Sequence, residues 1–218
     1  MEVMNIGDES FAELATLNYA RISYQLENYS QAVKAYSTLG IIAKLENNKA
    51  EAQIGLMNAY FMDKQYQNAI AQAERAERVT TEEQDRVRIR YIKGKSYYML
   101  GERTKALPLL TELAKNRISP EGAESAYLLI SDIFDKGDFA KVEREVYAFS
   151  DSKTPQSYWL AKAYILLGDT FAERENWEQA RATYNSILES YKPKIKDDIE
   201  EQIKMRLSRI EEKKSNLQ

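Results

Sequence analysis

The sequence contains no cysteine and no histidine, and it has only 8 glycines and 4 prolines among 218 residues. Without cysteine and histidine the chain has no zinc finger, disulfide framework, redox dithiol, or thiol or Ser-His-Asp nucleophile. The scarcity of glycine and proline argues against a loop-rich fold, and the abundance of helix-forming residues favours helices. We therefore expect an all-α protein.

Long apolar runs and a strong net charge are also missing. No run of 18 apolar residues occurs, so the sequence predicts no membrane span. The formal charge of −3 provides no electrostatic basis for binding nucleic acid. The acidic N-terminus, MEVMNIGDESF, lacks the basic and apolar regions of a signal peptide. The absence of cysteine suits the cytoplasm and, after removal of a signal peptide, the bacterial periplasm equally, so the compartment stays open.

What the sequence does contain is an internal repeat. Five segments share one apolar pattern, and each carries a landmark residue at the same position: Ala32, Ala69, Ala106, Val142 and Ala180. Successive landmarks are 37, 37, 36 and 38 residues apart. An accidental match would not keep this phase over four intervals, so the chain is a repeat array.

Each repeat is predicted to form two helices joined by a tight turn. In the last repeat, apolar residues recur at helical spacing from Leu160 to Phe171, and a second apolar stripe begins at Ala180. Gly101 and Gly137 lie in two of the turns, where a helix ends in the left-handed conformation that glycine adopts without strain. One such hairpin cannot bury its apolar face, whereas a stack of several can.

These motifs resemble the tetratricopeptide repeat (TPR). The resemblance rests on the turns Leu100-Gly101 and Gly137-Asp138-Phe139, and on an alanine followed four residues later by tyrosine, as in Ala180 and Tyr184. It covers roughly residues 13–191, with a period a few residues longer than is usual for the family. It implies a right-handed α-solenoid of about five helix hairpins plus a C-terminal capping helix. The chain also resembles the TPR arrays of bacterial envelope proteins.

Two terminal segments flank the predicted array. Residues 1–12 show no capping pattern, and we expect this N-terminal segment to be partly disordered. Residues 192–218 contain an amphipathic helix with one apolar stripe, formed by Ile195, Ile199, Ile203, Leu207 and Ile210. The stripe favours a capping helix that buries the open end of the last hairpin. The alternative is a coiled-coil seam for a partner helix.

The resemblance also implies where a ligand would bind. In TPR folds, residues at fixed positions of the first helix of each repeat face a concave groove. Carrying these positions over yields ten candidates for binding a peptide or partner: Arg21, Tyr24, Asn58, Phe61, Arg88, Tyr91, Lys95, Tyr98, Tyr127 and Phe134. The aromatic members would contact apolar side chains, and the polar members would bond peptide carbonyl or acidic groups. The alternative is that the rings only pack between neighbouring helices.

Nothing in the sequence points to an enzyme. The acidic pairs Glu82-Glu83, Asp197-Asp198 and Glu200-Glu201 fall at a helix start or on a surface helix, and no phosphate- or dinucleotide-binding motif occurs. We therefore expect no catalytic, cofactor-binding or metal-binding residue. The predicted function is a non-catalytic scaffold or adaptor that binds a peptide segment or partner protein in the concave groove. The alternatives are a homo-oligomer such as a homodimer, formed through the cap helix or an end repeat, and a fragment of a longer TPR array.

Overall fold

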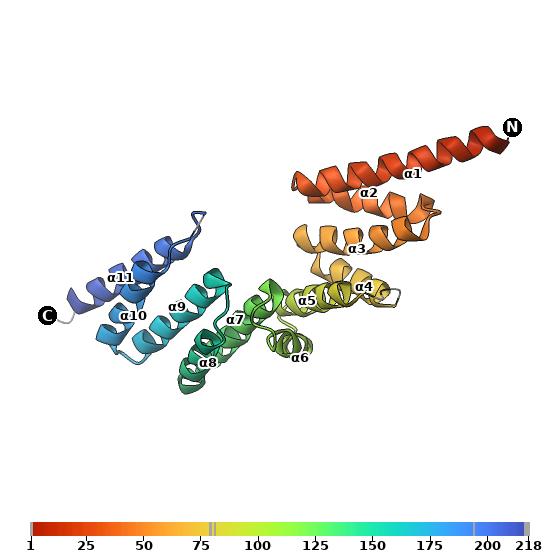
Figure 1. The fold of residues 1–218 in the computed structure, drawn as a ribbon. Helices are drawn as coiled ribbons and strands as arrows, with labels where there is room; N and C mark the ends of the chain where they lie inside the picture. The colour runs from red at the N-terminus through yellow and green to blue at the C-terminus, as the bar shows by residue number, and fades with distance from the viewer. Residues whose placement is uncertain (1, 79, 81, 194, 216–218) are drawn as a thin grey trace. The chain divides into compact units, whose positions relative to one another are not determined.

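The structure is a computed structural model that describes residues 2–78, 80, 82–193 and 195–215. Over these residues the chain forms eleven helices and no strand, which confirms the expected all-α class (Figure 1). In this described part, no helix is both long enough and apolar enough to cross a membrane. The outermost residues of the two predicted terminal segments, 1 and 216–218, lie outside the described residues, as do 79, 81 and 194.

The chain divides into two compact units, Met1–Leu109 and Leu110–Gln218, where the sequence predicts one array. The division falls within α6 (Arg103–Leu113), next to Pro108, which has no N–H for the helical hydrogen-bond pattern. The first unit contains α1 (Glu2–Gln25), α2 (Tyr29–Ile42), α3 (Glu46–Met62), α4 (Tyr66–Glu77) and α5 (Glu83–Met99). The second contains α7 (Pro120–Asp135), α8 (Phe139–Asp151), α9 (Ser157–Glu173), α10 (Trp177–Ser190) and α11 (Ile199–Ser215).

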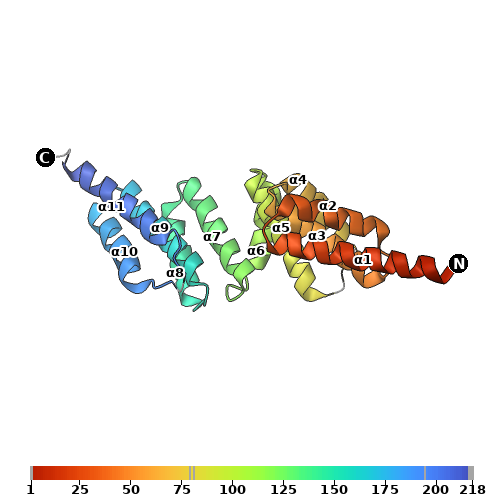
Figure 2. The same cartoon turned by 90° about the horizontal axis from the view of Figure 1, so that it is seen from above.

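Each predicted repeat corresponds to one pair of helices. We call the first helix of each pair the A helix (α1, α3, α5, α7 and α9) and the second the B helix (α2, α4, α6, α8 and α10). In the first unit, helices that follow one another from α1 to α5 pack together, and α3 also contacts both α1 and α5. Helix α1 extends beyond its partner α2 (Figures 1 and 2). Because α1 begins at Glu2, its backbone is helical through most of the segment for which we expected partial disorder.

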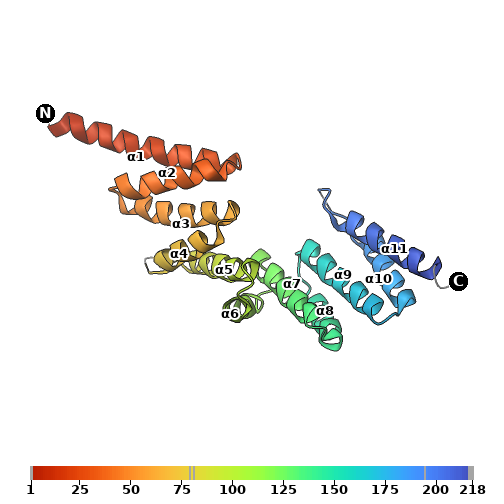
Figure 3. The ribbon, with the colours of Figure 1, turned by 180° about the vertical axis from the view of Figure 1, so that it is seen from behind.

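In the second unit, α11 packs against the last hairpin. Helix α9 contacts α7, α8, α10 and α11, and α9, α10 and α11 lie side by side (Figure 3). Ile199, Ile203 and Ile210 of α11 are buried in the core of this unit, and Leu207 packs against it. Ile195, which the sequence places in the same stripe, precedes the helix and is 84% exposed.

The repeat landmarks explain how closely the helices pack. All five landmarks have an exposed fraction of 0%: Ala32, Ala69, Ala106, Val142 and Ala180. Gly101 and Gly137 have φ angles of 78° and 73°, so the predicted left-handed turns are confirmed. The corresponding turn residues of the other three repeats also have positive φ, near 58–60°, although none is glycine: Glu27, Lys64 and Glu175. The same turn therefore recurs in all five repeats.

Candidate peptide-binding surface

Three of the predicted polar residues take part in pairs between successive A helices of the first unit. Arg21 of α1 donates through Nε and Nη2 to the two carboxylate oxygens of Glu51 of α3, at 2.5 Å each. Arg88 of α5 donates through Nε to Oδ1 of Asn58 of α3 at 3.0 Å. In both pairs the partners are 30 residues apart. Polar side chains predicted to bind a peptide thus also hold neighbouring A helices together.

Aromatic and basic residues of α3 and α5 form a cluster next to the second of these pairs. The rings of Phe61 and Tyr91 meet edge to face with their centroids 6.0 Å apart. The Lys95 ammonium lies 5.4 Å from the Phe61 centroid and donates to the Tyr91 hydroxyl at 3.1 Å. The Arg88 guanidinium lies 5.5 Å from the Tyr91 centroid. Five of the ten predicted residues are therefore brought together here: Asn58, Phe61, Arg88, Tyr91 and Lys95.

Four of the predicted aromatic residues, one in each of the first four hairpins, have a structural role within their hairpin. Tyr24 packs on Tyr29 with centroids 5.4 Å apart, and Phe134 packs on Phe139 at 5.7 Å. Phe61 contacts Tyr66 at 6.1 Å in the same way, and Tyr98 is covered by the Arg103 guanidinium, 3.5 Å from its centroid. In every case the contact joins the end of an A helix to the first residue of its B helix, five positions later. This packing leaves Phe61 and Tyr98 only 8% and 9% exposed.

A second aromatic cluster lies between α7 and α9. Tyr127, a predicted residue, stacks on Trp159 with centroids 5.5 Å apart, and Trp159 also meets Tyr158 edge to face at 4.9 Å. The Lys162 ammonium lies 5.6 Å from the Tyr127 centroid and 5.9 Å from that of Tyr158. The rings of all three residues are partly exposed. This is a mixed aromatic and cationic surface of the kind that binds peptide side chains.

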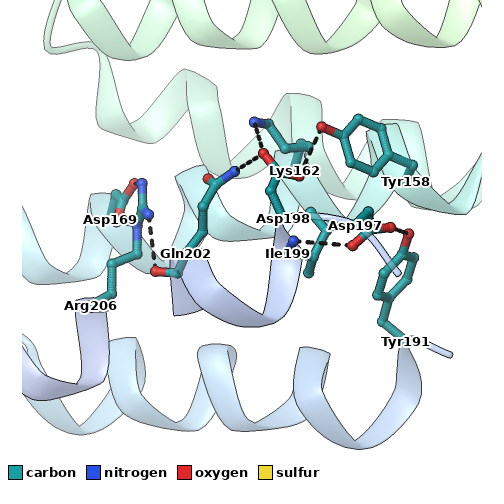
Figure 4. A network of polar contacts seen from close by, with 9 residues as sticks. All are labelled: Tyr158, Lys162, Asp169, Tyr191, Asp197, Asp198, Ile199, Gln202 and Arg206. Atoms are coloured by element: carbon teal, nitrogen blue, oxygen red, sulfur yellow. Dashed lines mark hydrogen bonds and ion pairs between the residues drawn. The ribbon is translucent and has the colours of Figure 1, made fainter. Parts of the chain in front are cut away.

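Polar contacts tie α11 to α9 (Figure 4). Arg206 donates through Nε and Nη2 to the two carboxylate oxygens of Asp169, at 2.6 and 2.8 Å. Asp198 accepts from the Tyr158 hydroxyl at 3.0 Å, and its carboxylate lies 3.8 Å from the Lys162 ammonium. Burial by itself would raise the pKa of Asp198, but the bond from Tyr158 and the charge of Lys162 outweigh it, so its pKa is lowered. The carboxylate therefore stays ionised as a link between the two helices.

The Asp169–Arg206 pair borders a cleft of about 560 Å³ on the A-helix side of the second unit. It is lined by Phe134, Asp169, Ala172, Glu173, Glu175, Trp177, Tyr184, Arg206, Arg209, Ile210 and Lys213. The Lys213 ammonium lies 4.8 Å from the centroid of Trp177. Arg209 is exposed and forms no ion pair within the part of the chain that the structure describes. The cleft thus combines aromatic rings with charged groups of both signs, and Phe134 is the predicted residue that it contains.

The hairpin of α9 and α10 identifies the repeat. A family model, the tetratricopeptide repeat, matches residues 157–192. These residues form a tetratricopeptide repeat. The crystal structure of YrrB, described as a TPR protein with an unusual peptide-binding site, has the same fold, with a TM-score of 0.55 and 20% sequence identity. The match covers 80% of this chain and 84% of that chain, and it confirms the predicted TPR-like α-solenoid class. No curated protein matches the chain.

The tetratricopeptide repeat is in general a non-catalytic protein-interaction module, and the matched hairpin therefore supports a role in protein interaction. Sequence reasoning missed five residues of the candidate surface: Tyr158, Trp159, Arg206, Arg209 and Lys213. The adjacent aromatic residues at the start of α9 were a usable signal. The helical spacing of Arg206, Arg209 and Lys213 was a second usable signal, because it places these three basic residues on one face of the C-terminal helix.

Proposed function

We propose that this protein is a non-catalytic adaptor that binds a peptide segment of a partner protein on its A-helix side. The observation that carries the proposal is the cleft of the second unit, where Phe134 and Trp177 adjoin Arg209 and Lys213. Aromatic rings provide large contact areas at a low cost in side-chain entropy, and an exposed arginine can pair with a carboxylate. The partly exposed polar members of the α3–α5 cluster, Asn58, Arg88 and Lys95, are proposed as a further contact surface in the first unit.

The charges of the cleft indicate what kind of peptide it would accept. Glu173 and Glu175 lie in the same cleft as Arg209 and Lys213, so a wholly acidic segment would be repelled at one part of the lining. We propose a segment with an apolar or aromatic side chain next to an acidic one. The ring of Trp177 would contact the first, and Arg209 would pair with the second.

Charge reversal at Arg209 tests this function. Peptides selected from a displayed random library on the full chain would be titrated against wild type and against Arg209→Glu. We expect binding at least tenfold weaker for the variant, because the carboxylate of the peptide would face a carboxylate. Arg144→Glu is the matched control, since Arg144 is exposed on α8 and outside this cleft. Equal affinity for the two variants, or the absence of any selected peptide, would contradict the proposal.

A second candidate function is self-association, and the structure favours one of the two surfaces that the sequence offers for it. The apolar stripe of the cap helix is used inside the second unit, where Ile203 is fully buried. Helix α1 and the residue that follows it, in contrast, expose large apolar side chains along one face, each at least half exposed: Phe11, Leu14, Tyr19, Ile22 and Leu26. The charged side chains described on α1 are used for contacts with α3. Glu13 accepts hydrogen bonds from the Leu45 backbone and the Asn48 side chain, and Arg21 pairs with Glu51.

The order of residues on this face suits a second copy of the chain. We infer that two α1 helices pair in antiparallel orientation about a two-fold axis between Asn18 and Tyr19. Phe11 would then lie against Leu26 of the second copy, and the small Ala15 against Ile22. Burial of these side chains would remove roughly 1,000 Å² from water in total, which is near the lower limit for a specific interface. A concentration-dependent dimer is therefore expected.

The mass in solution tests self-association. In light scattering after size exclusion, the wild-type mass should rise from 25.2 kDa towards twice that value as the protein concentration enters the micromolar range. Ile22→Glu should remain monomeric, because a dimer would bury two carboxylates without partners. Asn185→Glu, at an exposed position of α10, should behave as wild type. A monomer at every concentration, or a dimer unaffected by Ile22→Glu, would rule out this interface.

A further inference from the structure

A second cleft of the last hairpin lies between the B helices α8 and α10, with α9 as its floor. Its volume is about 520 Å³, which is in the range of pockets that hold small molecules or short peptides. The residues of α9 that line it, such as Leu160 and Tyr164, are not those that line the A-side cleft, such as Asp169 and Glu173. At 100° per residue the two sets fall on opposite faces of the helix. The two clefts are therefore separate sites.

The lining of this B-side cleft carries no charge. All twelve lining residues are apolar or bear a hydroxyl group, in a chain of which 30% of residues are charged. Buried Ala161, Leu167 and Ile187 form the apolar part. Burial, together with the charge of Glu143 and the neighbouring Tyr164, raises the pKa of the Tyr147 hydroxyl at the rim, so this group stays neutral. A charged ligand would lose its hydration here and gain no partner.

Several hydroxyl groups of the cleft are available for hydrogen bonding. Those of Thr183 and Ser190 donate to backbone carbonyls of α10, at 2.8 and 2.7 Å, and that of Tyr191 donates to Asp197. The others make no hydrogen bond to any residue that the structure describes: Tyr147, Ser157, Tyr164 and Ser186. A hydroxyl both donates and accepts, so these four can satisfy the N–H and C=O groups of a peptide backbone.

The shape of the cleft suits an extended chain. Its α9 side runs from Ser157 to Leu167, which is about 15 Å at the rise of a helix. An extended peptide of four or five residues has about this length. We propose that the B-side cleft binds a short extended peptide segment without charged residues, which inserts an aliphatic or aromatic side chain between Leu160 and Ile187 and bonds through its backbone to the free hydroxyls. This site goes beyond the adaptor function proposed for the A-helix side and does not depend on it.

Parallel selection on two variants tests this proposal. A displayed random heptapeptide library would be selected on the full wild-type chain and on the full Ser186→Lys chain. Ser186 is exposed, and its hydroxyl makes no bond in the described structure, so the substitution adds a charge to the cleft without removing an internal contact. We expect one group of peptides to be recovered with wild type and not with Ser186→Lys, and we expect this group to share an uncharged core of about four residues.

Titration of one such peptide provides the controls. Binding should be at least tenfold weaker for Ser186→Lys and should change less than twofold for Asn185→Lys, an exposed neighbour outside the cleft. Tyr164→Phe removes only one hydroxyl and should weaken binding about fivefold. Arg209→Glu, which disables the A-side cleft, should leave this binding unchanged. Peptides that bind the A-side cleft would be recovered with both chains. The absence of any peptide specific to wild type, a charged core in those peptides, or equal affinity for Ser186→Lys and wild type would overturn the proposal.

Discussion

Replacing Gly168 with alanine should lower the free energy of unfolding of the second unit by about 2–3 kcal/mol. A Cβ atom at Gly168 would lie far inside van der Waals distance of the Tyr184 ring. That ring is 1% exposed, and its hydroxyl donates to Asp169 at 2.6 Å, so it cannot move away without disturbing the core and this bond. The cost of this steric clash should exceed the stabilisation of about 1 kcal/mol that usually results from replacing a helical glycine with alanine.

Both tryptophans of the chain, Trp159 and Trp177, belong to the second unit, so their fluorescence during urea unfolding reports on this unit. In a Tyr184→Leu background the cost of Gly168→Ala should largely disappear, because the ring is no longer there. Gly40 of α2 is the matched control, since its nearest contact for a Cβ is Ala52 at 3.9 Å. Gly40→Ala should be neutral or stabilising when helical circular dichroism is followed. An unchanged midpoint for Gly168→Ala would show that the hairpin tolerates a wider separation.

Replacing Arg206 with alanine should release α11 from α9 and lower the free energy of unfolding of the second unit by about 2–3 kcal/mol. The Arg206 and Asp169 side chains are only 25% and 19% exposed. Loss of the guanidinium would leave the Asp169 carboxylate partly buried, with the Tyr184 hydroxyl as its one side-chain donor among the described residues. Although burial by itself would lower the pKa of Arg206, the bond to Asp169 raises it by more, so the guanidinium stays charged.

Hydrogen exchange measured by mass spectrometry checks this prediction at the helix concerned. Amides of α11 should lose protection in Arg206→Ala, whereas those of the first unit should not change. Arg209→Ala, on the same helix but exposed, should cost less than about 0.5 kcal/mol. Combining Arg206→Ala with Asp169→Ala should cost less than the sum of the two single changes, as expected for residues in direct contact. Unaltered protection of α11 in Arg206→Ala would mean that its apolar stripe suffices to hold it.

The repeat period, the helix pairs and their turns were predictable because each depends on nearby residues. A small landmark such as Ala180 recurs once per repeat, and a glycine such as Gly101 marks a left-handed turn by its own conformational freedom. The burial of Ile203 follows from the apolar stripe of α11 itself. Lys64, in contrast, adopts a left-handed conformation that its residue type would not suggest, because the surrounding hairpin imposes the turn.

The candidate surface was less predictable because it depends on which side chains meet across helices. Sequence position places Phe61 and Tyr98 on the predicted groove, yet only the packed hairpin shows that Tyr66 and Arg103 cover them. The sequence likewise does not show whether Arg21 binds a peptide or a neighbouring helix. The fold shows that it pairs with Glu51 of α3 at 2.5 Å.

The amino-acid sequence by itself thus determined an all-α repeat protein of paired helices, since helical periodicity, small residues and turn residues act over a few positions along the chain. Only the tertiary structure decided which polar groups are used internally, that the Asp169–Arg206 pair joins α11 to the last hairpin, and where the two clefts of that hairpin lie. The physical reason is that pairing and cavity shape arise from residues about 30 to 40 positions apart, whose contacts depend on how the helices pack.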